Sequence, residues 1–163
     1  MIYTRRRLLL LAAGAAVVAL AAGSLIKNQA AARGSKAVNT LDSPSGAAIK
    51  GYDPVAYFVS GKPMRGLEEH AVTHAGARWL FSNAENKALF ERDPAKYIPA
   101  YGGYCAYGVA QGYLVKIEPD SWAIRNGKLY LNYDKGVQKQ WSAAPDKFIA
   151  EAEKKWPRLV TPQ

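Results

Sequence analysis

The sequence predicts a small α+β domain: an antiparallel sheet built from β-hairpins, with short helices packed on it and two helices at the C-terminal end. Asn126-Gly127 stands between two β-prone runs. This dipeptide favours a two-residue type I′ hairpin because both of its positions need a positive φ. Val137 and Trp141 follow at helical spacing. Pro145 then opens a segment whose apolar residues share one helix face: Phe148, Ile149, Ala152 and Trp156.

Turn and capping residues divide the first half of the domain. Asp53-Pro54 indicates a turn or a helix start, since Asp can cap a helix and Pro suits its first position. A weak alternation over 72–82 predicts a hairpin with one aromatic face inward. Asn83 or the preceding Ser caps a helix that we expect to run to about residue 91. Asp93-Pro94 starts another short helix, which Pro99 stops.

The second half changes period after Gly112. The alternation over 113–117 predicts a strand, and 118–120 a turn before the Asn-Gly hairpin. Asp134 caps the first of the two C-terminal helices, and Pro157 ends the second. The sequence shows no internal repeat.

The stretch 101–112 contains the only cysteine of the chain between glycines and tyrosines. It predicts a short buried helix over 104–110 that Gly112 ends. Cys105 then lies near a helix N-terminus, where the helix dipole lowers a thiol pKa and favours a reactive or ligating sulfur. The alternative is a small buried hydrophobe, which is the usual role of a lone Cys in an apolar run. Intermolecular pairing of Cys105 also stays open.

Residues 1–32 resemble an export signal. Arg5-Arg6-Arg7 precedes an apolar run, 8–22, and Ala30-x-Ala32 offers a cleavage site. The Arg-rich head also resembles the twin-arginine type. The alternative is an uncleaved anchor over 8–26, the only route to a membrane that the sequence offers. Both interpretations place the domain in the periplasm or elsewhere outside the cytoplasm.

We expect a flexible linker over 33–47, which is polar and lacks apolar periodicity, and a single folded domain over 48–160. The chain carries a formal charge of +9, but residues 1–40 hold six basic residues and no acidic one. The remainder has 16 basic and 13 acidic residues, a charge of +3. This balance does not indicate a nucleic-acid-binding protein. A protein partner in the periplasm is a further expectation.

Candidate metal ligands are few. His70 and His74 are the only histidines. On a strand they lie on one side, about 13 Å apart, so that one metal ion cannot bind both. One His with Cys105 and an oxygen ligand would suit copper or zinc. Cys105 with either His would also make a thiol-enzyme dyad. The chain has no G-x-S-x-G, H-E-x-x-H or P-loop motif.

Four segments resemble the YHS domain family, in particular its exported single-domain members, over residues 50–159: Gly51-Tyr52-Asp53-Pro54-Val55-Ala56-Tyr57-Phe58, Gly76-Ala77-Arg78-Trp79-Leu80-Phe81-Ser82, 90–99, and Tyr101-Gly102-Gly103-Tyr104-Cys105-Ala106. The resemblance implies a small α+β domain. The wider family includes metal-associated forms that occur with heavy-metal transporters and oxygenases. Those forms resemble D-P-V-C followed by F-C-S-x-x-C, whereas this chain has Ala56, Ser82 and Asn86 at the cysteine positions.

The sequence thus predicts an exported, non-enzymatic binding or accessory module. Its ligand would be a transition metal, copper above all, or a small molecule near Cys105. Four further residues complete the predicted site: Tyr101, Tyr104, Tyr107 and Asp53. Tyr and Trp must supply most of the aromatic core, and their polar tips could face a shared cleft. Two alternatives are a structural or protein-interaction domain, with Cys105 fully buried, and a thiol enzyme, with a His against the sulfur.

Overall fold

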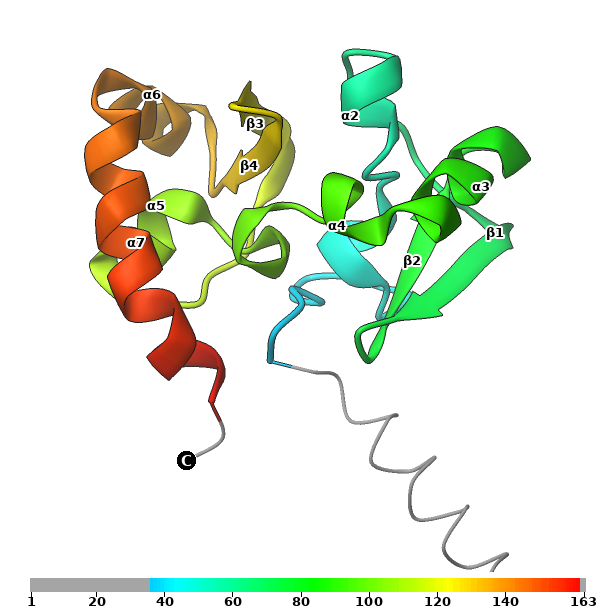
Figure 1. Cartoon of the computed structure of the whole chain (residues 1–163), viewed down its shortest axis with the longest axis horizontal. Coiled ribbons are helices and arrows are strands. Elements are labelled where there is room, and N and C mark those ends of the chain that lie inside the picture. Colours follow the sequence, from blue (N-terminus) through cyan, green and yellow to red (C-terminus); the bar gives the residue numbers. More distant parts are fainter. Residues whose placement is uncertain (1–35, 162–163) are drawn as a thin grey trace, which may run out of the picture. The chain divides into compact units, whose positions relative to one another are not determined.

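The computed structural model describes residues 36–161 (Figure 1). The predicted export signal or anchor at 1–32 lies outside these residues. In chain order the elements are η1 (Ala48–Gly51), α2 (Ala56–Val59), β1 (Leu67–His74), β2 (Ala77–Phe81), α3 (Ala84–Arg92), α4 (Pro94–Tyr97), η2 (Ala100–Gly103), α5 (Ala106–Gln111), β3 (Glu118–Arg125), β4 (Lys128–Asn132), α6 (Lys135–Ala143) and α7 (Pro145–Val160).

The predicted α+β class is confirmed. The strands form two separate antiparallel sheets of two strands each, β1–β2 and β3–β4, with the helices packed around them (Figure 1). At the tip of β3–β4, Asn126 and Gly127 have φ values of 50° and 71°, as the predicted type I′ turn requires. Both predicted C-terminal helices, α6 and α7, are present.

The structure contains an internal repeat that the sequence pattern does not reveal. In the first hairpin Leu67 pairs with Phe81 and Ala71 with Leu80, with a register shift between these pairs. In the second hairpin the residues 51 positions later repeat this arrangement: Glu118 pairs with Asn132, Trp122 with Leu131, and the same shift separates them. α6 begins 51 residues after α3, and α7 begins 51 residues after α4. We call 48–97 the first repeat and 100–160 the second repeat.

The repeat extends to unusual backbone angles. The two residues inside η1, Ile49 and Lys50, have left-handed (φ, ψ) values of (44°, 46°) and (60°, 20°). Their counterparts in η2, Tyr101 and Gly102, have values of (55°, 37°) and (59°, 17°). Non-glycine residues seldom adopt such angles, so their occurrence at matched places shows that both halves have the same local fold.

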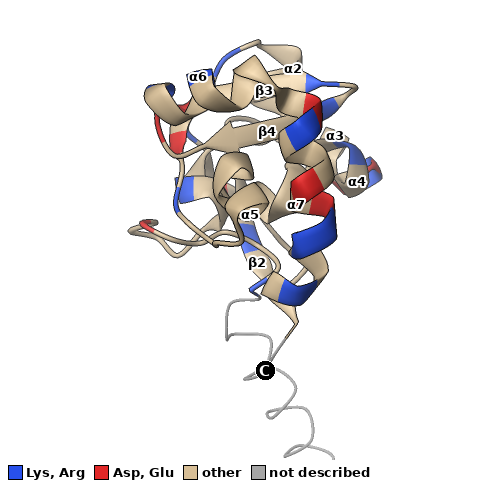
Figure 2. Cartoon of the chain, turned by 90° about the vertical axis from the view of Figure 1, so that its left-hand side faces the viewer, with Lys and Arg blue, Asp and Glu red and all other residues tan. Residues whose placement is uncertain are grey.

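The repeats differ most at their C-terminal ends. α4 has four residues, whereas α7 has 16 and packs along α5. The prediction that Pro157 ends this helix is wrong, because α7 continues to Val160. A proline lacks one N–H donor and disturbs the turn before it, but here the helix continues for three more residues. Figure 2 shows basic and acidic positions interspersed along α7.

Polar side chains begin α3 and α6, as predicted. Asn83 accepts a hydrogen bond from the backbone N–H of Asn86 at 2.8 Å and caps α3. Asp134 does the same for α6, through the N–H of Val137 at 2.7 Å. A helix start leaves such N–H groups without partners inside the helix. These caps therefore fix where each helix leaves its hairpin.

The segment after Gly112 differs from its prediction. Residues 113–117 alternate in polarity but form no strand, and β3 begins at Glu118, where a turn was expected. The carbonyl of Val115 instead accepts a hydrogen bond from the N–H of Cys105 at 3.3 Å. The N–H of Tyr113 donates to the carbonyl of Gly108 at 2.9 Å. The backbone of this segment thus bonds the residues of α5 and its cap, and it does not pair with a strand.

Part of the segment expected as a linker packs in the domain. Val38 and Asn39 are 3% and 1% exposed. The N–H of Asn39 donates to the carbonyl of Gly102 at 2.9 Å, and its side-chain amide donates to the carbonyl of Gly103 at 2.9 Å. The N–H of Ile49 in turn donates to the carbonyl of Asn39 at 2.8 Å. This segment therefore joins the left-handed turns of both repeats.

Candidate ligand-binding site

Cys105 is enclosed within the second repeat. Its side chain is the N-terminal cap of α5, as its place in the sequence suggests, and Sγ accepts from the N–H of Gly108 at 3.3 Å. The thiol lies 3.9 Å from the side-chain oxygen of Asn132, which accepts from it. The residue is 1% exposed. Cys105 thus has a packed, hydrogen-bonded place and no open face.

The expected lowering of the Cys105 pKa is wrong. Burial raises the pKa of the thiol, and the negative charge of Asp134 adds to this. The N–H groups of Gly108, Tyr133 and Tyr107 act in the opposite direction without reversing the shift. Taking a thiolate out of water is unfavourable, and α5 has only six residues. The sulfur therefore stays protonated in the folded protein.

The two histidines lie on β1, as the strand prediction requires. His74 packs edge-on against Phe90, with ring centroids 5.7 Å apart, and His70 lies 3.7 Å from the carboxylate of Glu69. Both belong to the first repeat, whereas Cys105 belongs to the second. Across residues 36–161 no three His, Cys, Asp or Glu side chains come close enough together to hold a metal ion. These donors do not fit a copper or zinc centre.

Asp53 is fully buried and saturated with hydrogen bonds. One carboxylate oxygen accepts from the N–H groups of Val55 and Ala56 at 2.8 and 3.2 Å. The other accepts from the N–H and the hydroxyl of Ser82, at 2.9 and 2.7 Å, and from the side-chain amide of Asn86 at 2.6 Å. Ala56, Ser82 and Asn86 hold the positions that are cysteines in the metal-associated forms the sequence resembles. A polar network centred on Asp53 therefore stands at these positions.

The three predicted tyrosines divide between the core and a pocket. The hydroxyl of Tyr104 donates to the carbonyl of Val38 at 3.4 Å, and the ring of Tyr107 packs on that of Phe148 at 5.0 Å between centroids. Neither lines the pocket described below, whereas Tyr101 does. Its hydroxyl donates to the Glu153 carboxylate at 3.2 Å. Burial and this carboxylate together raise the Tyr101 pKa well above its usual range.

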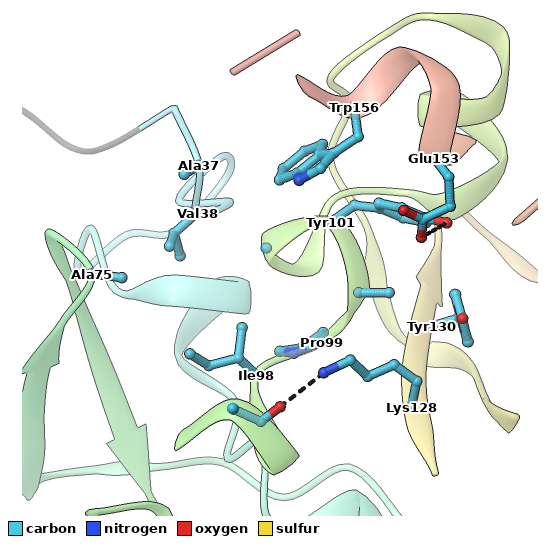
Figure 3. Close-up of a pocket in the computed structure, with 13 residues that line it drawn as sticks. Ala37, Val38, Ala75, Ile98, Pro99, Tyr101, Lys128, Tyr130, Glu153 and Trp156 are labelled. Carbon is cyan, nitrogen blue, oxygen red and sulfur yellow. Dashed lines mark hydrogen bonds between the residues drawn. The ribbon is translucent and has the colours of Figure 1, made fainter. Parts of the chain in front are cut away.

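A pocket of about 410 Å³ opens between the two repeats. Figure 3 shows Trp156, Tyr101 and Glu153 on one side of it, and Ile98, Ala75, Val38 and Ala37 on the other. Tyr130 and Lys128 complete the wall from β4, and the Lys128 ammonium donates to the carbonyl of Ala95 at 2.8 Å (Figure 3). The site thus combines aromatic rings with one carboxylate and one ammonium group.

Among the charged and aromatic residues of the pocket only Tyr101 was predicted as a site residue, and Lys128, Tyr130, Glu153 and Trp156 were not. The only sequence signal for them was the general expectation that Tyr and Trp tips share a cleft. Lys128 and Tyr130 both reach the pocket because residues two positions apart on a strand lie on the same face of the sheet. Glu153 and Trp156 reach it because they lie three residues apart on α7, in the part of the helix that has no counterpart in α4.

No helix within residues 36–161 is both long and apolar enough to cross a membrane.

A comparison of the chain with models of protein families, with curated proteins and with solved structures finds no match. The resemblance to the YHS domain family therefore stays a prediction that rests on the sequence motifs.

Proposed function

We propose that this chain is a non-enzymatic binding or accessory module, exported from the cytoplasm, whose small ligand occupies the pocket between the repeats. The observation that carries this proposal is the pocket itself. Its volume of about 410 Å³ falls in the range of roughly 300–1,000 Å³ typical of small-molecule sites. Its walls are mainly apolar and aromatic, with a few polar groups, which is the usual composition of such sites. Export is inferred from residues 1–32 alone.

The surroundings of Cys105 favour this proposal over the thiol-enzyme alternative. That alternative needs a histidine against the sulfur and a thiolate that substrate can reach. The polar partners of Cys105 are instead Gly108 and Asn132, and the side chain is buried with a raised pKa. The same burial gives no support to copper or zinc binding through this sulfur. A structural domain without any ligand is the remaining alternative.

A pocket-filling substitution separates these alternatives. Ala100 lines the pocket, so Ala100→Trp fills it without removing a charged or aromatic group. Ala150→Trp adds the same ring at an exposed position of α7. Isothermal titration of the full chain would use a panel of small anions, cations, zwitterions and polyols.

We expect a member of this panel to bind the unmodified chain and Ala150→Trp, and to lose at least tenfold in affinity for Ala100→Trp. Circular dichroism would confirm that both variants are folded. Binding that Ala100→Trp leaves unchanged places the ligand elsewhere and overturns the proposal. Absence of binding across the whole panel would favour the structural alternative.

A further inference from the structure

The pocket contains two opposite charges that do not form an ion pair with each other. Glu153 and Lys128 both line it, and neither forms an ion pair with another side chain among residues 36–161. Lys128 uses one N–H of its ammonium on the carbonyl of Ala95, which leaves two donors. Glu153 accepts from the Tyr101 hydroxyl through one oxygen, which leaves the second oxygen available.

Aromatic rings surround the carboxylate end of the pocket. The Tyr101 ring lies 5.7 Å from that of Trp156 and 6.1 Å from that of Tyr130, at interplanar angles of 60° and 57°. All three rings line the pocket. The faces of Trp and Tyr attract cations, and alkylated ammonium groups are the ligands that such arrangements typically bind.

We infer that the pocket binds a small zwitterion, with an alkylated ammonium against Tyr101, Trp156 and Glu153 and a carboxylate against Lys128. This inference rests on the proposed function and specifies its ligand class. A simple cation offers the Lys128 ammonium no opposite charge and is repelled by it. A simple anion does the same with the Glu153 carboxylate. Only a molecule with both charges satisfies both ends.

Isothermal titration of the full chain with matched probes tests the inference. Glycine betaine and the longer γ-butyrobetaine carry both charges at two separations. Choline keeps the quaternary ammonium but lacks the carboxylate. 3,3-Dimethylbutanoate has the shape of glycine betaine, with carbon in place of the charged nitrogen. We expect one of the two betaines to bind at least tenfold more tightly than choline and 3,3-dimethylbutanoate.

Two substitutions assign each charge to its partner. Glu153→Gln should abolish the preference for the betaine over 3,3-dimethylbutanoate, and Lys128→Met should abolish its preference over choline. Glu151→Gln and Lys139→Met are the matched controls, because neither residue lines the pocket. Circular dichroism and the melting temperature would show that each variant is folded.

The outcomes separate this inference from the proposed function. Failure of both betaines to bind overturns the zwitterion inference, as does choline binding of equal strength. If another probe then binds and Ala100→Trp weakens its binding, the proposed function stands without the zwitterion. If no probe of any charge class binds, both proposals fail.

Discussion

Cys105 occupies in the second repeat the position that Asp53 occupies in the first. Each follows a left-handed turn and accepts a hydrogen bond from a backbone N–H in the first turn of the short helix that comes next. Asp53 accepts from the N–H of Ala56, and Cys105 from the N–H of Gly108, its counterpart 52 residues later. The N–H of Ser82 also bonds Asp53, and that of Tyr133, at the corresponding place after β4, acts to lower the pKa of Cys105.

The two repeats use different side chains to accept hydrogen bonds from these backbone N–H groups. A carboxylate has two oxygens, and Asp53 uses both. The thiol of Cys105 has a single acceptor atom, and the side-chain oxygen of Asn132 supplies a second one by accepting from the N–H of Tyr107 at 3.4 Å. Asn132 stands where the first repeat has Phe81. The Cys105 side chain therefore caps α5, and this contact accounts for its burial.

The Asp53 network predicts a large stability loss for Asp53→Asn. The amide nitrogen of Asn would face the N–H of Ser82 or those of Val55 and Ala56, so that buried donors lose their acceptor. A buried donor without a partner costs about 1–3 kcal/mol, and more is lost where the bond involves a charge. We expect the free energy of unfolding to fall by about 3 kcal/mol in urea titrations.

Asp134→Asn is the control for this measurement, because Asp134 is an exposed helix cap and Asn caps helices equally well. We expect a change within about 0.5 kcal/mol there. Equal effects of the two substitutions would contradict a special role for Asp53.

Cys105 should resist thiol reagents in the folded protein. The thiol is 1% exposed and its pKa is raised, so that neither contact with the reagent nor the thiolate is available. We expect iodoacetamide labelling at pH 8, followed by mass spectrometry, to be slow in buffer and complete in concentrated urea. Fast labelling of the folded chain at the rate of a free thiol would show that the sulfur is accessible.

Metal binding through Cys105 should be absent. We expect titrations of the full chain with Zn(II) and with Cu(I) to give the same bound metal for the unmodified protein and for Cys105→Ser. Any uptake that the two proteins share then belongs to other donors. Stoichiometric binding that disappears in Cys105→Ser would restore the metal hypothesis that the sequence suggested.

The buried tyrosines predict a loss of stability at alkaline pH. Burial, with smaller contributions from Tyr52, Asp120 and Asp53, raises the pKa of Tyr57 far above that of a free tyrosine. Above about pH 10 the unfolded chain releases this proton while the native state keeps it. The unfolded state then binds fewer protons, and the free energy of unfolding falls as pH rises.

We expect the free energy of unfolding to decline as pH rises above about 10, and Tyr57→Phe to make the decline shallower. This variant also loses a hydrogen bond to the carbonyl of Pro119, 3.1 Å in length, so it should be less stable at pH 7. Tyr113→Phe, at a position that is 66% exposed, is the control and should leave the slope unchanged. Identical slopes for Tyr57→Phe and the unmodified chain would show that Tyr57 does not cause the loss of stability at alkaline pH.

The fold was predictable where a local signal decides the structure. Asn126-Gly127 fixes a hairpin by its turn alone, and Asn83 and Asp134 fix helix starts by their caps. The strand predicted over 113–117 does not form, because the backbone of this segment bonds Cys105 and Gly108 instead of a neighbouring strand. The continuation of α7 past Pro157 was also not predictable from a local pattern, because a proline usually ends a helix.

The repeat and the pocket could not be predicted from local patterns. At a shift of 51 residues the two halves share few identities, among them Gly76 with Gly127, Leu80 with Leu131 and Pro94 with Pro145. Their common fold is carried instead by register and backbone angles, which a sequence does not display. Glu153 from α7 and Lys128 from β4 line the same pocket because of the tertiary fold, which no local pattern displays.

Gly102 offers a last test of how the repeats are joined to the N-terminal segment. Its counterpart Lys50 has the same left-handed φ, 60° against 59°, so this angle alone does not demand glycine. A Cβ on Gly102 would lie 1.8 Å from the carbonyl oxygen of Ala37, which is backbone and cannot rotate away. Gly127 also has a positive φ, but a Cβ there meets open space.

We therefore expect Gly102→Ala to destabilise the protein by several kcal/mol, and Gly127→Ala by about 1 kcal/mol, the cost of the strained angle alone. Urea titrations of both variants would measure the difference. Because Ala37 also lines the pocket, Gly102→Ala should weaken ligand binding as well, whereas Gly127→Ala should not. Equal losses of stability would mean that the N-terminal segment moves aside freely and contributes little to holding the repeats together.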